Sequence, residues 1–123
     1  IRHPMFANED LSMNIGANLA VNTAVTLMTG TAGSLVAANP KTIQMLDALM
    51  TEEAQSYFLV HCGGRRLGIA LEGAEDKIYP AVKEVTGNKE FLMVFTFGEY
   101  GYDEHSSNIC GGLMLSFTAF GKN

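Results

Sequence analysis

The chain has 123 residues, of which 47% are hydrophobic and 17% charged, and its net charge is −5. This balance is typical of a globular domain with a core and excludes a disordered tail. No basic cluster is larger than Arg65-Arg66, so we expect neither nucleic acid nor a membrane as a partner, and no apolar run approaches the roughly 18 residues of a membrane span. Because the chain begins at Ile1 rather than Met, we interpret residues 1–123 as a single domain of a longer protein.

The first third of the chain is weakly periodic and then becomes helical. Residues 1–20 are rich in Asn and Gly and predict an entry segment with one edge strand near Leu11–Ile15. Residues 23–29 are β-branched and apolar, which predicts a strand. A helical pattern follows over residues 34–50, where Asn39-Pro40 is typical of an N-cap with Pro at the first helical position. One kinked helix or two short helices fit this region.

The second half alternates strands with helices. Residues 57–60 predict a strand buried on both faces, and residues 71–85 predict a helix that Pro80 bends. Residues 91–97 predict a central strand, and residues 113–120 a closing strand with one apolar face. The expected fold class is mixed α/β (α+β), a mixed sheet of about four to five strands with two main helices packed on it.

The strands that end at Cys62 and at Gly98 are expected to be parallel neighbours, because the chain between them contains one helix and looks like a crossover connection. Their carboxyl ends then lie side by side, where ligands bind in open α/β sheets. Four residues on these strands and on the closing strand are expected to be almost fully buried: Leu59, Val94, Phe95 and Leu115.

Polar and glycine residues follow both strand ends. Glycines let backbone N–H groups approach a ligand closely, Arg65 suits a carboxylate, and Glu99 suits an ammonium group. Asn108 lies in the loop that returns over the same edge and can both donate and accept. The alternative is that the glycines form ordinary turns and that Arg65 pairs with Glu99 in a structural salt bridge. The predicted ligand site is Gly63, Gly64, Arg65, Gly98, Glu99 and Asn108.

The cysteines and histidines offer two further functions. Cys62 is a candidate nucleophile of a thiol-dependent enzyme, but its neighbour His61 is expected on the opposite face of the strand, so we do not expect an enzyme. His3, His61 or His105 could ligate a haem iron, but no haem-attachment motif is present, and we expect no cofactor. No cysteine or histidine spacing is typical of a zinc site, and we expect both cysteines to be reduced.

Several of these residues together resemble one protein family. The shared pattern is Cys62-Gly63-Gly64-Arg65, then Leu67-Gly68, Glu72 at a helix start, Phe97-Gly98-Glu99, Asn108 before the closing strand, and Arg2-His3-Pro4 at the entry. This pattern is similar to the C-terminal module of the FIST domain family, over nearly the whole chain. Two positions depart from it, Tyr100 after Gly98-Glu99 and Ile109-Cys110 after Asn108.

The resemblance implies a sensory domain of an intracellular, cytoplasmic signal-transduction protein. Its implied partners are a small-molecule ligand, with amino acids or related metabolites suggested, the N-terminal half of the same protein and a downstream signalling module. Some relatives are haem-based nitric oxide sensors, which is the alternative function that the resemblance implies. The departures at Tyr100 and Ile109-Cys110 concern the identity of the ligand more than the fold.

Overall fold

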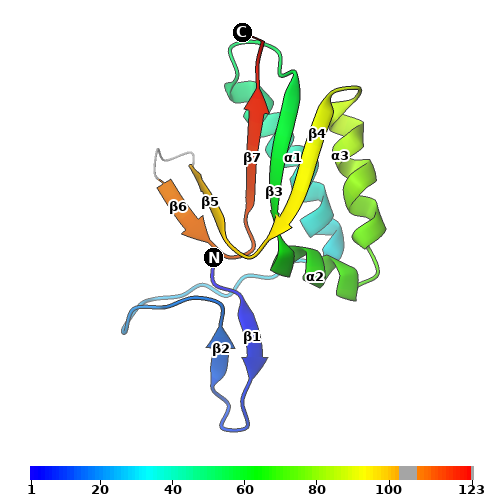
Figure 1. Ribbon diagram of the computed structural model, residues 1–123. Coiled ribbons are helices and arrows are strands. Elements are labelled where there is room, and N and C mark those ends of the chain that lie inside the picture. The colour runs from blue at the N-terminus through cyan, green and yellow to red at the C-terminus, as the bar shows by residue number, and fades with distance from the viewer. Residues whose placement is uncertain (103–107, 123) are drawn as a thin grey trace.

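The computed structural model describes residues 1–102 and 108–122 (Figure 1). The elements in chain order are β1 (Pro4–Ala7), β2 (Met13–Ile15), α1 (Ala32–Leu49), β3 (Ser56–Cys62), α2 (Gly63–Leu71), the 3-10 turn η1 (Glu75–Lys77), α3 (Ile78–Thr86), β4 (Glu90–Thr96), β5 (Glu99–Tyr102), β6 (Asn108–Gly111) and β7 (Leu115–Phe120). Helices pack on a mixed sheet, so the predicted α+β class is confirmed.

The main sheet has the strand order β4-β3-β7. β3 and β4 are parallel in a register that places Tyr57 opposite Phe91 and Cys62 opposite Thr96, so the predicted parallel pair is confirmed. β7 runs antiparallel on the other side of β3. The sheet has three strands in the described part of the chain rather than the four to five predicted, because β1–β2 and β5–β6 form separate hairpins. The prediction that residues 91–97 form the central strand is wrong, since β3 is central and β4 lies at the edge.

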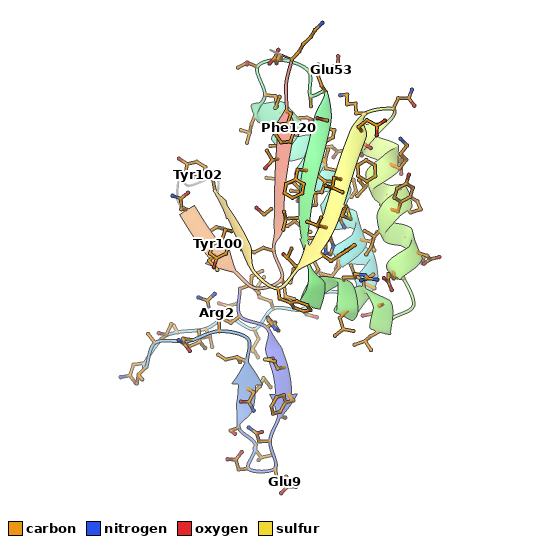
Figure 2. All side chains as sticks on the ribbon, in the orientation of Figure 1. Arg2, Glu9, Glu53, Tyr100, Tyr102 and Phe120 are labelled. Atoms are coloured by element: carbon orange, nitrogen blue, oxygen red, sulfur yellow. The ribbon has the colours of Figure 1, made fainter. Side chains whose placement is uncertain are left out.

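The helices cover one face of this sheet, as Figure 1 shows for α1 and α3 behind the strands. The main core cluster is built from Ile43, Ala54, Tyr57, Leu59 and Val82, and a second cluster from Ala32, Ile69, Ala74 and Ile78. The opposite face keeps large apolar side chains exposed, namely Phe58, Leu92 and Phe120. Figure 2 labels Phe120 on β7. The sheet therefore has one packed face and one open face.

The burial of the four predicted core residues follows this arrangement. Leu59 is fully buried on the central strand, as predicted, whereas Val94 and Leu115 are only half-buried, so their predicted near-complete burial is wrong. Phe95 is 39% exposed, so its predicted burial is wrong. The physical reason is the edge position of β4, because no described strand covers its outer side.

α1 is one continuous helix that runs through Pro40, so the N-cap predicted at Asn39-Pro40 is wrong. The cap is Thr31, whose Oγ1 accepts a hydrogen bond from the backbone N–H of Ser34 at 3.2 Å, while Ser34 Oγ accepts from the Thr31 N–H. The strand predicted at residues 23–29 is also wrong: this segment has no regular structure and its apolar side chains are exposed. β-branched residues favour a strand through cross-strand neighbours, which this segment lacks in the described structure.

The helical crossover between β3 and β4 begins earlier than predicted. Residues 63–64 form the first turn of α2 rather than a loop, and the predicted helix over residues 71–85 corresponds to η1 and α3. Pro80 lies in the first turn of α3, where its missing N–H leaves no intrahelical bond unmade. Gly87 ends α3 with φ 60°, a conformation that glycine adopts without steric strain. None of the helices in the described ranges combines the length and apolar character needed to cross a membrane.

Candidate functional site

The two predicted strand ends meet at the first turn of α2. A Cβ added at Gly63 would lie 3.1 Å from the backbone O of Thr96 and equally close to the ring of Phe97. Glycine at position 63 therefore lets α2 begin directly against the end of β4. This contact confirms that the carboxyl ends of β3 and β4 lie side by side, with Gly63, Gly64 and Gly98 near this edge.

Arg65 is buried at this edge, with 9% of its surface exposed. Its Nη2 donates to the carbonyl O of Leu35 in α1 at 2.9 Å, and its Nη1 donates to the carbonyl O of Leu113 at 3.3 Å. Burial lowers the pKa of the guanidinium, and the nearby Cys62 opposes that shift. Arg65 thus links α1, α2 and the segment before β7 through two backbone carbonyls.

The helix that Arg65 contacts is adapted to its internal proline. Pro40 has no N–H to donate to the carbonyl of Val36, four residues earlier. The side-chain amide of Asn39 replaces that donor, with Nδ2 at 3.0 Å from the O of Val36 and 3.3 Å from the O of Leu35. Asn39 thus gives the carbonyl of Val36 the donor that the proline cannot supply, whereas Arg65 adds a donor to the neighbouring carbonyl of Leu35.

The other predicted site residues lie on the β5–β6 hairpin. Glu99 begins β5 and pairs with Gly111, whereas Asn108 pairs with Tyr102 at the opposite end of the hairpin. Asn108 is exposed there, so its side chain does not share a pocket with the buried Arg65. The structure thus brings Gly63, Gly64, Arg65 and the start of β5 together but leaves Asn108 apart.

The histidines and cysteines have the following positions. His61 is fully buried; its Nδ1 donates to the carbonyl O of Cys62 at 2.9 Å, and its ring packs 5.2 Å from that of Phe95. Both cysteines are free thiols, Cys62 buried and Cys110 exposed. His3 packs its ring against two glycines, at positions 16 and 112, and His105 lies outside the described residues. No group of three potential metal ligands occurs within residues 1–102 and 108–122.

A cavity of about 370 Å³ lies along β4, between this strand and the crossover helices. Phe91, Met93 and Phe95 alternate along β4 and therefore share one face, which forms the wall on the sheet side. The complete lining is Arg66, Glu75, Ile78, Tyr79, Phe91, Met93 and Phe95. The rings of Tyr79 and Phe91 pack 5.7 Å apart within it. The cavity is apolar along most of its wall and carries charge at one place.

The charged part of the wall is an ion pair between Arg66 and Glu75. Arg66 Nε donates to Glu75 Oε1 at 2.6 Å, and a second guanidinium nitrogen contacts the same oxygen. Arg66 Cζ also lies 4.7 Å from the ring centroid of Phe95, in cation–π geometry. Both charged side chains remain nearly half exposed. One cation and one anion are therefore available to a ligand beside a hydrophobic wall.

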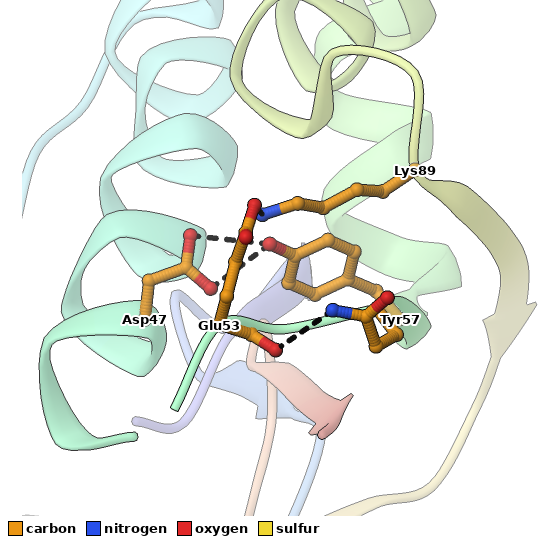
Figure 3. A network of polar contacts seen from close by, with 5 residues as sticks. Asp47, Glu53, Tyr57 and Lys89 are labelled. Carbon is orange, nitrogen blue, oxygen red and sulfur yellow. Dashed lines mark hydrogen bonds and ion pairs between the residues drawn. The ribbon is translucent and has the colours of Figure 1, made fainter. Parts of the chain in front are cut away.

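A second cavity of about 610 Å³ lies at the opposite end of the sheet, between Glu53-Gln55 and the turn 85–90. Lys89 and Glu53, which both line it, pair at 3.3 Å. Figure 3 shows this pair with a neighbouring contact, in which Tyr57 Oη donates to both carboxylate oxygens of Asp47 at 2.9 and 3.1 Å. Burial, with the Asp47 carboxylate second, raises the pKa of Tyr57 to about 12. These contacts tie α1 to β3 and to the start of β4, and their role is structural.

A family model for the FIST C domain matches residues 1–102 of the chain. The chain belongs to the FIST C domain family. This family consists of sensory domains of signal-transduction proteins. The match ends with the last residue of β5, although β7 completes the same sheet as β3 in this FIST C domain. No curated protein and no solved structure matches the chain.

Sequence reasoning missed the cavity along β4 because it treated residues 91–97 as covered on both faces. Two signals were present in the sequence. Phe91, Met93 and Phe95 recur every second residue, which places three large side chains on one face of a strand. Arg66 immediately follows Arg65, so a helix that buries one of them turns the other toward a different surface.

Proposed function

We propose that this FIST C domain senses a small zwitterionic metabolite with an apolar side chain, such as an amino acid, in the cavity along β4. The observation that carries the proposal is the Arg66–Glu75 ion pair set into an otherwise apolar wall. A volume of about 370 Å³ lies within the range of small-molecule sites. The proposal assigns binding rather than catalysis to the domain.

The chemistry of the wall matches the two ends of such a ligand. A guanidinium binds a carboxylate through two parallel hydrogen bonds, so Arg66 takes the ligand carboxylate. Glu75 then takes the ligand ammonium group, and the rings of Tyr79 and Phe91 contact its side chain. Because a half-exposed ion pair contributes at most about 1 kcal/mol, a zwitterion replaces the Arg66–Glu75 contact at little cost.

The signalling role extends the same proposal to the longer protein. A ligand that binds the folded cavity links β4 to α3 and to α2, which surround it. On ligand binding these elements become more ordered. The N-terminal half of the protein and a downstream signalling module, both in the cytoplasm, would detect that change. A ligand that contacts only one element would not produce such a coupling.

The test uses three related probes and calorimetric titration of the 123-residue chain. L-Phenylalanine has both charged groups, 3-phenylpropionate lacks the ammonium group, and phenethylamine lacks the carboxylate. We expect L-phenylalanine to bind at least tenfold more tightly than either partial analogue. Arg66→Gln should weaken its binding at least tenfold, whereas Lys83→Gln, which removes an exposed charge from α3, should leave it unchanged. Equal binding of all three probes, or equal effects of the two variants, would exclude the proposed site.

A further inference from the structure

The cavity along β4 has two ends that differ in chemistry. At one end the guanidinium carbon of Arg66 lies 4.7 Å from the ring centroid of Phe95, beside its ion-pair partner Glu75. At the other end the rings of Tyr79 and Phe91 pack 5.7 Å apart. Phe91 and Phe95 are four residues apart on one strand, which separates their Cα atoms by about 13 Å. The cavity is therefore elongated, with one charged end and one aromatic end.

The two charges are adjacent, and this restricts the head group of a ligand. Arg66 Nε and Glu75 Oε1 are 2.6 Å apart. Two charged side chains this close together suit a carboxylate and an ammonium group carried by the same carbon, as in an α-amino acid. A zwitterion whose charges are far apart, such as a longer peptide, cannot place both of them at this end. The head group of the ligand therefore lies beside Phe95.

The wall between the two ends is apolar. Met93 lies between Phe91 and Phe95 on the same face of β4 and packs against both core clusters, and Ile78 is 3% exposed. Neither side chain offers a hydrogen-bond donor, so this stretch suits an apolar group rather than a polar one. A benzyl side chain on the α-carbon covers only the first part of the distance. Tyr79 is 61% exposed at the far end, which leaves surface for a further ring to pack on.

We propose that the cavity selects its α-amino acid by the length of the side chain, and that Tyr79 and Phe91 form a second subsite for a ring at the end of that side chain. The ligand class is then an α-amino acid with an extended apolar side chain that ends in a ring. This inference rests on the proposed function, which assigns the head group to Arg66 and Glu75. Tyr79 determines the specificity, because the packing of two aromatic rings stabilises a complex beyond the area that it buries.

The first test compares two isomeric probes by calorimetric titration of the 123-residue chain. Para-phenyl-L-phenylalanine carries its two rings in line, whereas β,β-diphenyl-L-alanine has the same composition with both rings on one carbon. We expect the in-line probe to bind at least tenfold more tightly than its isomer and than L-phenylalanine. Because the isomers have the same atoms, a difference between them reports the shape of the cavity rather than hydrophobicity. Equal binding of the two isomers would overturn the inference.

The second test locates the second subsite with variants of Tyr79. Tyr79→Ser removes the ring and should lower the preference for the in-line probe over L-phenylalanine at least fivefold, whereas Tyr79→Phe keeps the ring and should retain that preference. Tyr102→Ser is the matched control, since Tyr102 is 70% exposed on β5 and does not line the cavity. Circular dichroism should show that each variant is folded. A loss in Tyr79→Ser that is equal for both probes would overturn the second subsite.

The outcomes distinguish this inference from the proposed function. If L-phenylalanine binds through Arg66 but the in-line probe binds no more tightly, the inference fails and the proposed function stands. If none of the probes binds, the proposed function fails and this inference fails with it. Tight binding of the in-line probe that Arg66→Gln and Tyr79→Ser each weaken supports both.

Discussion

The carboxylate of Glu72 accepts a hydrogen bond from the backbone N–H of Ala32, with Oε2 and N 3.1 Å apart. Ala32 is the first residue of α1, and Glu72 lies at the end of α2. A negative charge near the start of a helix is stabilising. The first turn of α1 contains no acidic residue of its own, so Glu72 supplies that charge from α2. The contact joins the helix before β3 to the helix after it.

Loss of this contact should weaken the domain measurably. We expect Glu72→Gln to lower the free energy of unfolding by about 0.5–1 kcal/mol, through loss of charge at a helix N-terminus. Urea unfolding followed by circular dichroism measures the change, and the effect should shrink at high salt. Glu9→Gln, which removes an exposed charge from the turn between β1 and β2, is the control. Equal effects of the two changes would contradict the capping role.

Truncation of Arg65 should mainly lower the stability of the domain, whereas truncation of Arg66 should mainly weaken ligand binding. Arg65→Ala removes a buried guanidinium that donates to two carbonyls, so we expect a loss of about 2–3 kcal/mol in unfolding free energy. Arg66→Ala removes a half-exposed ion pair and should cost less than about 1 kcal/mol. Ligand affinity should follow the reverse order in any variant that remains folded. A destabilisation by Arg66→Ala as large as that by Arg65→Ala would contradict the two assignments.

A double-mutant cycle tests whether Asn39 compensates for Pro40. Asn39→Ala should cost about 1–2 kcal/mol, because it leaves the carbonyl of Val36 in the interior of α1 without a donor. In a Pro40→Ala background the new N–H supplies that donor, so the same change should cost measurably less. The difference between the two costs is the coupling energy of the pair. Additive effects would mean that Asn39 stabilises the helix by some other contact.

Tyr57 should make stability depend on alkaline pH. The pKa of its phenol is raised from 10.0 to about 12, so the folded state favours the protonated form. This contribution is complete below pH 10 and is lost as the pH rises from about 10 to about 12. Tyr57→Phe should cost about 1.5 kcal/mol at neutral pH and should flatten this part of the pH profile. An unchanged alkaline slope in Tyr57→Phe would assign the slope to other groups.

Local pattern was sufficient for part of the fold. Residues 57–60 and the apolar stripe of Ile78 and Val82 correspond to β3 and α3, because β-branched and aromatic residues in a short run favour a strand and a helical stripe favours a helix. The prediction that residues 57–60 are buried on both faces is wrong, since Phe58 lies on the open face of the sheet. The parallel pairing followed from the crossover rule. The centre and the edge of the sheet could not be told apart, since β4 has the composition of a buried strand while lying at the edge.

The site was less predictable than the fold. Glycines at positions 63 and 64 look like a loop in sequence, but they form the first turn of α2, where a residue without a Cβ at position 63 leaves room for the backbone of Thr96. That turn directs Arg65 into the core and leaves Arg66 at the cavity. The periodicity of the sequence alone does not show which of the two adjacent arginines is buried. The contact of Arg66 with Glu75 depends on the break after α2, where Gly73 adopts φ 67°.

The central position of β3 has a consequence for how the chain folds. Ser56 on β3 pairs with Phe120 on β7, roughly 60 positions later in the sequence. Such a contact forms slowly, because the chain between the two residues must first lose conformational entropy. β3 gains its second neighbour only when the final strand arrives, so a nascent chain holds an exposed apolar strand until synthesis has passed residue 120. Folding kinetics should therefore be limited by the docking of β7, and a chain shortened before Leu115 should aggregate rather than remain a smaller folded domain.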